Sequence, residues 1–206
     1  MESVYELELK NICKSFGTLK ANHNIQLQVK KGEVHAIVGE NGAGKTTLMN
    51  ILYGLYQPDE GEIYFRGERV HFSSPSDAIQ KGIGMVHQHF MLSQSLTVAE
   101  NIALGKPPKG KVIWKQSDLE EIIRPILDSM HLKIDLDAKV SDISVGQMQR
   151  VEIVKTLYRG ATFIILDEPT AALTPGEVEE LYQIMRNLTT RGYTFHFITH
   201  KIHEVL

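Results

Sequence analysis

The sequence has little of what disulfide-linked, nucleic-acid-binding or membrane-spanning proteins depend on. Its single cysteine, Cys13, cannot form an intramolecular disulfide, which favours a reducing compartment. Lysine and arginine number 22 against 25 aspartate and glutamate, so the chain lacks the basic excess that grips nucleic acid. No apolar run approaches the roughly 20 residues of a membrane helix, and the start MESVYELELK is unlike a secretory signal. We expect a soluble cytosolic protein that does not bind nucleic acid.

Strand and helix patterns follow one another along the 206 residues, a length that suits one domain with a buried core. VYELELK and NIQLQVKKGEVHAIVG alternate apolar and polar residues, as half-buried strands do. VHAIVG and FIILDE are continuous apolar runs, which are typical of strands buried on both faces. The order predicts an α/β chain, one domain over residues 1–206, with a helical subdomain inserted at about 90–160.

Apolar residues at helical spacing predict three amphipathic helices. The stripes are Leu48, Ile51, Leu52 and Leu55; Leu119, Ile122, Ile123, Ile126, Leu127 and Met130; and Leu181, Ile184, Met185 and Leu188. Pro125 is expected to kink or restart the second helix. TPGE, at 174–177, has the spacing of a capping box with proline at the first helical position, so it predicts where the third helix starts.

A glycine loop, GENGAGKTT, joins a strand of the buried type to the first helix. Gly39, Gly44, Lys45 and Thr46 fit the pattern G-x-x-x-x-G-K-[ST]. The glycines allow the backbone N–H groups to turn inward at a helix N-terminus and cradle an anion. Lys45 would reach the β- and γ-phosphates, and the Thr46 hydroxyl would ligate Mg²⁺. An ordinary glycine-rich turn is the alternative, but the flanking strand and helix favour a loop that binds a nucleoside triphosphate.

An acidic pair ends the second apolar run, in FIILDEP. Asp167 would hold Mg²⁺ through water, and Glu168 would orient or deprotonate an attacking water. A polar strand exit is the alternative interpretation. Because a carboxylate beside the metal ligand suits hydrolysis, a nucleotide kinase is disfavoured.

A second N-terminus of interest lies in DISVGQMQRVEIVKTLYRGA. Ser144 and Gly146 stand just before an amphipathic helix, where a serine is either an N-cap or part of a second phosphate-binding surface. The spacing leaves open whether that surface faces the same nucleotide or another.

The order of these motifs resembles the nucleotide-binding domain of ABC transporters over nearly the whole chain. GENGAGKTT is similar to the Walker A motif, FIILDE to Walker B and ISVGQ to the LSGGQ signature. Gln88 in MVHQHF matches the Q-loop, His200 in FITHK the switch histidine, and Phe16 in CKSFG the aromatic residue that stacks on adenine. Each of these three residues also has a non-functional interpretation: Gln88 as a solvated loop residue, His200 as a histidine at a strand end and Phe16 as a core residue. Six matches in order are specific.

The resemblance implies a P-loop NTPase core with a mixed β-sheet, an antiparallel β subdomain and the inserted helical subdomain. It implies an ATPase that binds ATP with Mg²⁺. The implied nucleotide contacts are Phe16, Gly39, Asn41, Gly42, Ala43, Gly44, Lys45, Thr46, Thr47, Ser144, Gly146 and Gln147. The implied metal-binding residues are Thr46, Gln88 and Asp167, and the implied catalytic residues are Glu168, His200 and Gln88.

The resemblance also implies partners. Two such domains would meet head to tail, so that Ser144, Gly146 and Gln147 of one cover the ATP on the other. GIGMVHQHFMLSQSLTVAENIALG, SVGQMQRVEIVKTLYRGA and EPTAALTP look like the ATPases of bacterial importers for simple sugars and nucleosides, and this chain like the first of two tandem cassettes. The expected partners are a second cassette, in tandem or as a homodimer, permease subunits that meet the segment after Gln88, and indirectly a solute-binding protein. The expected location is the cytoplasmic face of the membrane.

Three features depart from the family pattern. Val145 replaces the first glycine of the signature, and Thr174 stands where the D-loop has an aspartate. The chain stops at KIHEVL, where Ile202, Val205 and Leu206 look like the start of another helix, so we expect a fragment of a longer protein.

Two rival functions share the same motifs. DNA-repair ATPases of this type insert a long coiled coil between the glycine loop and the signature, and no heptad run lies there. Translation factors built from two cassettes should carry a basic arm, which this chain lacks. The importer is the favoured interpretation.

Overall fold

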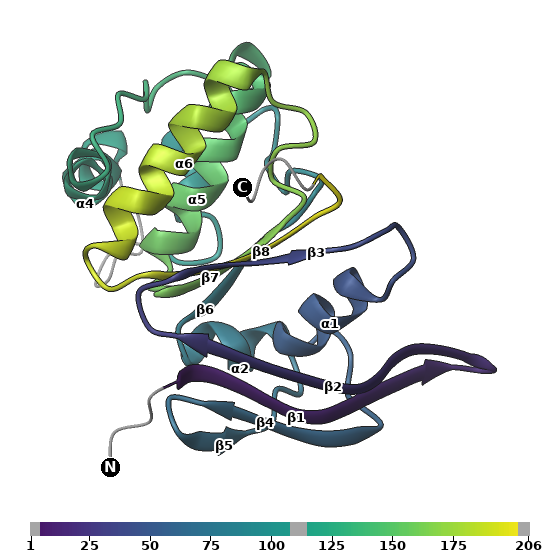
Figure 1. Cartoon of the computed structure of the whole chain (residues 1–206). Coiled ribbons are helices and arrows are strands. Elements are labelled where there is room, and N and C mark those ends of the chain that lie inside the picture. The colour runs from purple at the N-terminus through teal and green to yellow at the C-terminus, as the bar shows by residue number, and fades with distance from the viewer. Residues whose placement is uncertain (1–4, 108–114, 202–206) are drawn as a thin grey trace.

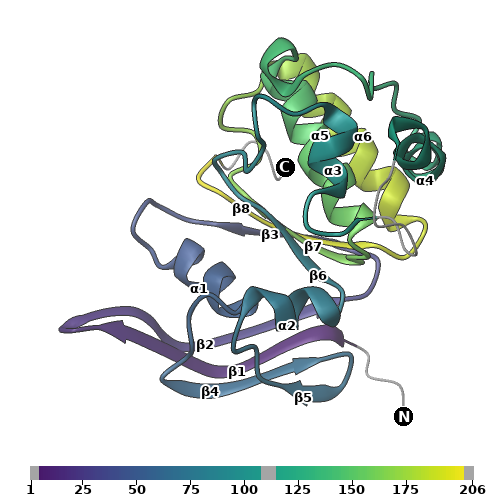
Figure 2. The same cartoon turned by 180° about the vertical axis from the view of Figure 1, so that it is seen from behind.

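Two four-stranded sheets organise the computed structural model, which describes residues 5–107 and 115–201. Helices α1 (Lys45–Leu52) and α2 (Pro75–Gln80) lie between the two sheets, and the other helices lie on the far side of the parallel sheet (Figures 1 and 2). The mixed set of strands expected from the sequence is thus divided between an antiparallel and a parallel sheet.

The antiparallel sheet has the order β2–β1–β4–β5. Its strands are β1 (Tyr5–Phe16), β2 (Leu19–Lys30), β4 (Glu60–Phe65) and β5 (Glu68–Val70). The apolar residues of the alternating pattern meet across the ladder, as in Leu9 opposite Leu27. They face α1 and α2, which confirms the strand predicted at VYELELK from Tyr5 onward and the strand predicted at NIQLQV.

The parallel sheet has the order β3–β8–β7–β6. Its strands are β3 (Val34–Val38), β6 (Ile83–Val86), β7 (Phe163–Asp167) and β8 (Thr194–Thr199). Strand β7 is central and buried throughout, as its apolar run predicts. Successive side chains of β7 point to opposite faces of the parallel sheet. Ile165 packs with α1 in the apolar core between the two sheets, whereas Ile164 and Leu166 pack with the outer helices in a second apolar core.

The prediction that VHAIVG is buried on both faces is wrong. Strand β3 is at the edge of the parallel sheet, and Val34 and Val38 are 42% and 38% exposed. An apolar run is equally compatible with an edge strand, which has a neighbouring strand on one side only.

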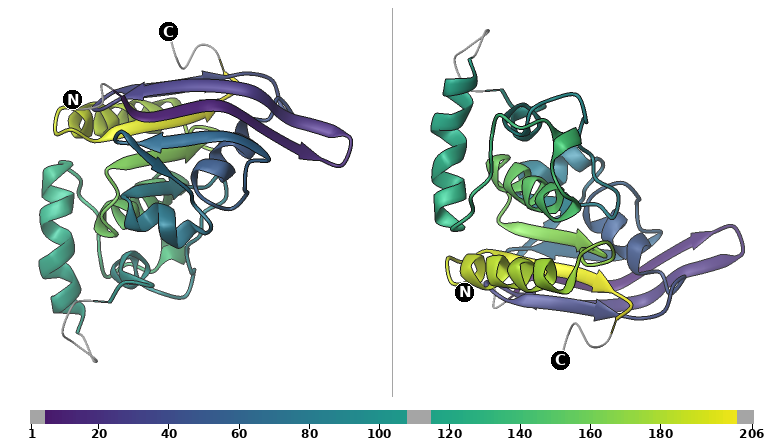
Figure 3. Two further views of the ribbon diagram at one scale, coloured as in Figure 1. Left: turned by 90° about the horizontal axis from the view of Figure 1, so that it is seen from below. Right: turned by 90° about the horizontal axis from the view of Figure 1, so that it is seen from above.

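Four helices form the outer layer: α3 (Val98–Ala103), α4 (Gln116–Ser129), α5 (Val145–Tyr158) and α6 (Pro175–Thr189). A short 3₁₀ turn, η1, spans Val140–Asp142. Helix α4 lies at one side of the molecule and the β1–β2 turn at the other (Figure 3). In the described part of the chain, no helix has both the length and the apolar character needed to cross a bilayer.

The helix predictions hold with two corrections and one qualification. Leu55 lies beyond the end of α1 and is exposed, because the chain leaves the helix at Gly54, where φ is +78°. Ile122 is exposed, so it is outside the buried stripe of α4. Helix α4 continues through Pro125 without a restart. The buried side chains of α4, Leu119, Ile123 and Leu127, offset the lost backbone bond.

The predicted start of α6 is confirmed. Thr174 is the N-cap and accepts a hydrogen bond from the backbone N–H of Glu177, and Pro175 is the first helical residue. The terminal residues Ile202, Val205 and Leu206, predicted to begin a helix, lie outside the described residues.

Candidate nucleotide site

The functional motifs gather at the carboxyl edge of the parallel sheet. Neighbouring strands end in register there, with Val38 opposite Thr199 and Asp167 opposite Ile198. The glycine loop leaves β3 at this edge, where the Gly39 N–H donates to the Thr199 carbonyl at 3.4 Å. Parallel strands therefore bring together segments that are far apart in the sequence.

Backbone geometry explains why the loop needs glycine at its end. Gly42 and Gly44 have φ values of +83° and +85°, in the left-handed region. A Cβ at Gly44 would lie 2.0 Å from the carbonyl oxygen of Ala21. The Asn22 side-chain amide donates to the Gly44 carbonyl at 3.1 Å, so β2 supports the loop directly.

The Lys45 ammonium is folded into the loop. Its Nζ donates to the carbonyl oxygens of Gly39 at 2.6 Å and Glu40 at 2.8 Å, and the residue is nearly buried. A lysine ammonium has three donors, so one is left for a phosphate oxygen in this geometry.

Asp167 is suited to a hard cation. The residue is 7% exposed, and its Oδ1 has no hydrogen-bond partner among the described residues. Burial raises the pKa of Asp167, the charge of Glu168 adds to this effect, and Lys45 opposes it. A buried carboxylate oxygen without a donor is costly alone. It fits Mg²⁺, which prefers oxygen ligands, and Thr46 offers a hydroxyl at the start of α1.

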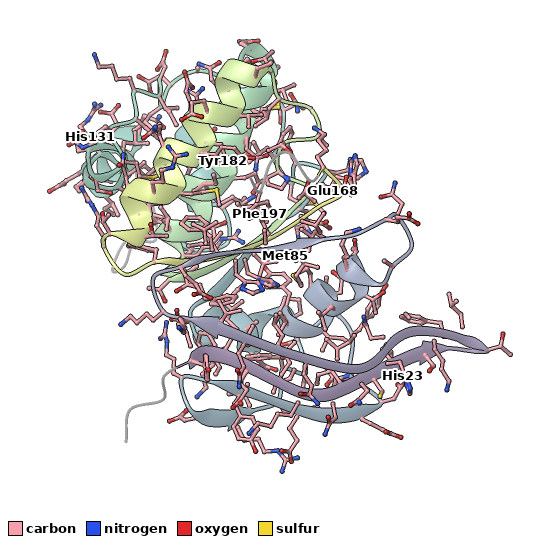
Figure 4. The ribbon with its side chains drawn as sticks, in the orientation of Figure 1. His23, Met85, His131, Glu168, Tyr182 and Phe197 are labelled. Atoms are coloured by element: carbon pink, nitrogen blue, oxygen red, sulfur yellow. The ribbon has the colours of Figure 1, made fainter. Side chains whose placement is uncertain are left out.

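Glu168 lies between the other two predicted catalytic residues. Its Oε2 is 3.5 Å from Gln88 Nε2, and its Oε1 is 3.4 Å from His200 Nδ1. Its φ of +46° is unusual for a non-glycine residue, and its N–H donates to the Ile198 carbonyl at 3.1 Å. The residue follows the end of β7 (Figure 4). The three side chains predicted from separate motifs are thus adjacent.

A cavity of about 460 Å³ unites most of these residues. Its lining comprises Phe16, Leu19, Lys20, Ala21, Asn41, Gly42, Gly44, Lys45, Thr46, Thr47, Gln88 and Glu168. Gly39, Ala43, Asp167 and His200, which the sequence also predicted, are not among the lining residues. Phe16 is 43% exposed at the rim, edge-to-face against Tyr56 at 5.4 Å. The structure therefore gives an exposed aromatic surface rather than a core phenylalanine.

Sequence reasoning missed Leu19, Lys20 and Ala21, which line the same cavity from the start of β2. They follow Phe16 closely in FGTLKA, and a lysine beside an exposed aromatic residue was the available signal.

The signature residues are not part of this cavity. Ser144 is the N-cap of α5, where its Oγ accepts from Gln147 N–H at 3.2 Å and its own N–H donates to Gln147 Oε1 at 2.8 Å. A Cβ at Gly146 would lie 2.2 Å from Glu177 Oε1, so this glycine allows α5 and α6 to approach closely. Val145 is 39% exposed. The structure separates this N-terminus from the chain's own glycine loop.

Comparison with known proteins places these motifs in a family. The sequence profile described as ABC transporter matches residues 22–171. The guanosine import ATP-binding protein NupO of Bacillus subtilis is 59% identical over 190 residues, which cover 91% of this chain and 37% of that protein. The nucleoside import ATP-binding protein NupA of Lactococcus lactis is 50% identical, covering 97% and 39%. The glucose import ATP-binding protein TsgD13 of Haloferax volcanii is 45% identical, covering 97% and 41%.

Solved structures agree with the sequence comparison. A nucleotide-free ATP-binding cassette from an ABC transporter superposes with a TM-score of 0.85 at 31% identity, covering 100% of this chain and 84% of that one. A dimeric post-hydrolysis state of the cassette MJ0796, bound to ADP and Pi, gives a TM-score of 0.79 at 30% identity, covering 96% and 89%. The chain spans about two fifths of the length of the three curated relatives named above. The chain belongs to the ABC transporter family and has the fold of its ATP-binding cassettes.

Proposed function

We propose that this chain is the ATP-binding and ATP-hydrolysing domain of an importer that drives uptake of a nucleoside through a membrane permease, with a simple sugar as the alternative cargo. The observation that carries the proposal is that Lys45, Gln88 and Glu168 line one cavity, while His200 lies against Glu168 and the buried Asp167 precedes Glu168 in the chain. Nucleosides come first because the two relatives of highest identity described above are named for nucleoside import. The import names also disfavour a soluble ATPase of translation or DNA repair.

The glycine loop binds the triphosphate. Backbone N–H groups at the start of α1 and the Lys45 ammonium hold the phosphates, and Phe16 stacks on the base. The contacts assigned to the loop are Gly39, Asn41, Gly42, Ala43, Gly44, Lys45, Thr46 and Thr47. Thr46, Gln88 and Asp167 would hold Mg²⁺, which would neutralise charge on the phosphates.

Hydrolysis falls to the residues around Glu168. Its carboxylate accepts a hydrogen bond from the attacking water, orients it and takes its proton. Gln88 holds that water from the other side, and His200 donates to the γ-phosphate. The positive φ of Glu168 sets the direction of its side chain, which is how a strained residue serves a reaction.

Completion of the site requires a second cassette. Ser144, Gly146 and Gln147 lie at the N-terminus of α5, where Ser144 is exposed and Gly146 is buried against α6, and they are outside the chain's own cavity, so they cover the nucleotide of a partner cassette. Permease subunits and, through them, a solute-binding protein complete the assembly at the cytoplasmic face of the membrane. We assign residues 90–160, which include α3, α4 and α5, to a helical subdomain within one ATP-binding domain.

The test is Glu168→Gln in the full-length protein, which keeps the size of the side chain and removes its charge. ATP binding should persist, whereas phosphate release should fall by roughly 10²-fold or more, the usual worth of a general base. The ATP-bound pair of cassettes should also last longer. Glu179→Gln, an exposed change on α6, is the matched control and should leave turnover unaffected. Turnover by Glu168→Gln at the parent rate would remove Glu168 from its assigned role.

Cargo is tested separately, in cells that carry the full-length protein. Uptake of labelled guanosine and of labelled galactose is compared between the parent and the Glu168→Gln protein. Loss of guanosine uptake supports the nucleoside assignment, and loss of galactose uptake alone would replace it with the sugar.

A further inference from the structure

The backbone that follows Gln88 is held by two charged side chains of another element. Met91 belongs to no strand or helix, yet its N–H donates to Glu152 Oε1 at 2.7 Å and its carbonyl accepts from Lys155 Nζ at 2.7 Å. Both side chains come from α5, the helix that begins at the signature residue Ser144. Met91 as a residue is 61% exposed, although both of its backbone polar groups are bound by α5 side chains.

Removing the charged side chains of Glu152 and Lys155 from water costs free energy, which some interaction has to offset. Glu152 and Lys155 are each 5% exposed, with Nζ and Oε2 3.5 Å apart. A buried ion pair is often no more stabilising than apolar residues of similar size, and neighbouring α5 positions such as Val151 and Val154 are fully buried and apolar. Apolar residues could neither accept a hydrogen bond from the Met91 N–H nor donate one to the Met91 carbonyl. We therefore attribute the burial of this pair to its hydrogen bonds with the Met91 backbone.

The other end of the Gln88 segment is also anchored. The His87 ring meets the Tyr53 ring edge-on at 5.8 Å, and Tyr53 is the C-cap of α1, the helix of the glycine loop. Gln88 therefore lies between an anchor on α1 and an anchor on α5. Its side chain reaches Glu168 at 3.5 Å from this position.

We propose that Glu152 and Lys155 are positioning residues that clamp Met91, fix the backbone after Gln88, and so couple the placement of Gln88 to the signature helix α5. A shift of α5 moves Met91 with it, and Gln88 is only three residues away. Neither residue contacts the nucleotide cavity. The effect on turnover rests on the proposed ATPase function, whereas the effect on the backbone does not.

Two variants separate the clamp from the ion pair. The exchange E152K/K155E keeps both charges, but an ammonium cannot accept from Met91 N–H and a carboxylate cannot donate to its carbonyl. E152Q loses the ion pair and keeps an acceptor for Met91 N–H, with Lys155 still available to donate. Val154→Ala removes buried methyl groups from the same helix without touching the clamp, and controls for a general loss of packing.

Hydrogen–deuterium exchange and ATPase kinetics are measured on the full-length protein. In E152K/K155E, exchange in the peptide covering 88–93 should rise roughly tenfold. Its kcat should fall roughly tenfold or more, while KM for ATP changes less than about threefold. E152Q and Val154→Ala should stay within about threefold of the parent in kcat. If E152K/K155E does not fold, Lys155→Met takes its place with the same expectations; it removes the donor to the Met91 carbonyl together with the ion pair, and E152Q, which loses the ion pair alone, separates the two effects.

Each outcome decides the inference. Unchanged exchange at 88–93 would show that the clamp does not hold the backbone, and faster exchange with normal kcat would show that the clamp does not position Gln88. A loss of kcat in E152Q together with a normal kcat in E152K/K155E would assign the effect to the ion pair and overturn the clamp. A parent protein that hydrolyses no ATP would overturn the proposed function and the kinetic part of the inference, and the exchange data alone would then decide whether the clamp exists.

Discussion

The buried histidine of the parallel sheet predicts a specific loss of stability in acid. His196 lies on β8, fully buried between the ring of His35, at 5.2 Å, and that of Phe163, at 6.3 Å. Neither ring nitrogen has a hydrogen-bond partner among the described residues. Burial lowers the pKa of His196 to about 3, and the nearby His35 adds to the effect. Folding therefore requires the neutral ring.

The magnitude follows from linkage. An unfolded histidine has a pKa of about 6.5, so below that pH the unfolded chain takes up a proton that the folded chain refuses. Stability from this group is full above pH 6.5 and is lost as the pH falls towards 3. The loss is about 1.4 kcal/mol per pH unit, which amounts to about 2 kcal/mol at pH 5.0.

The assay is denaturant unfolding of the parent and of His196→Leu at pH 7.5 and 5.0. Leucine removes the titrating ring and two buried nitrogens at similar volume, so the variant should unfold with about 2 kcal/mol less pH dependence than the parent. Other titrating groups, including Asp167, occur in both proteins and cancel in this difference. His23→Leu, at an exposed position on β2, controls for the loss of a histidine as such (Figure 4). Equal losses of stability in the parent and in His196→Leu would refute the reasoning.

Three further predictions concern single positions. Lys45→Met should weaken ATP binding by about 2 kcal/mol, roughly thirtyfold, because a charged donor to phosphate is lost. Titration of a fluorescent ATP analogue measures the affinity, and an unchanged affinity would contradict the role assigned to Lys45. Gly84→Ala should destabilise the fold by about 1–3 kcal/mol, since the new Cβ would lie 2.2 Å from Thr156 Cγ2; a denaturation midpoint equal to that of the parent would show that the sheet and α5 can separate at no cost. Thr174→Ala should cost about 1 kcal/mol by removing the N-cap of α6, and Thr174→Ser should restore it.

The linear order of motifs was enough to predict the fold class and most of the residues that line the cavity. A glycine at position 44 allows a positive φ, which glycine adopts at little cost, and the apolar run at 163–167 indicated a strand that the structure shows to be buried throughout. Capping at Thr174 and Ser144 was also predictable, because a cap is a contact between residues three positions apart.

Only the tertiary structure decided how distant segments meet. The exposure of β3 depends on its place at the sheet edge, and the three lining residues at the start of β2 depend on the approach of two sheets. The clamp on Met91 joins residues 61 and 64 positions apart, and no local pattern encodes such a pairing. Local preferences act over one turn or one strand, so a sequence can determine where elements begin and which faces are apolar. The pairing of a buried charged side chain with a particular peptide group depends on how the elements pack in three dimensions.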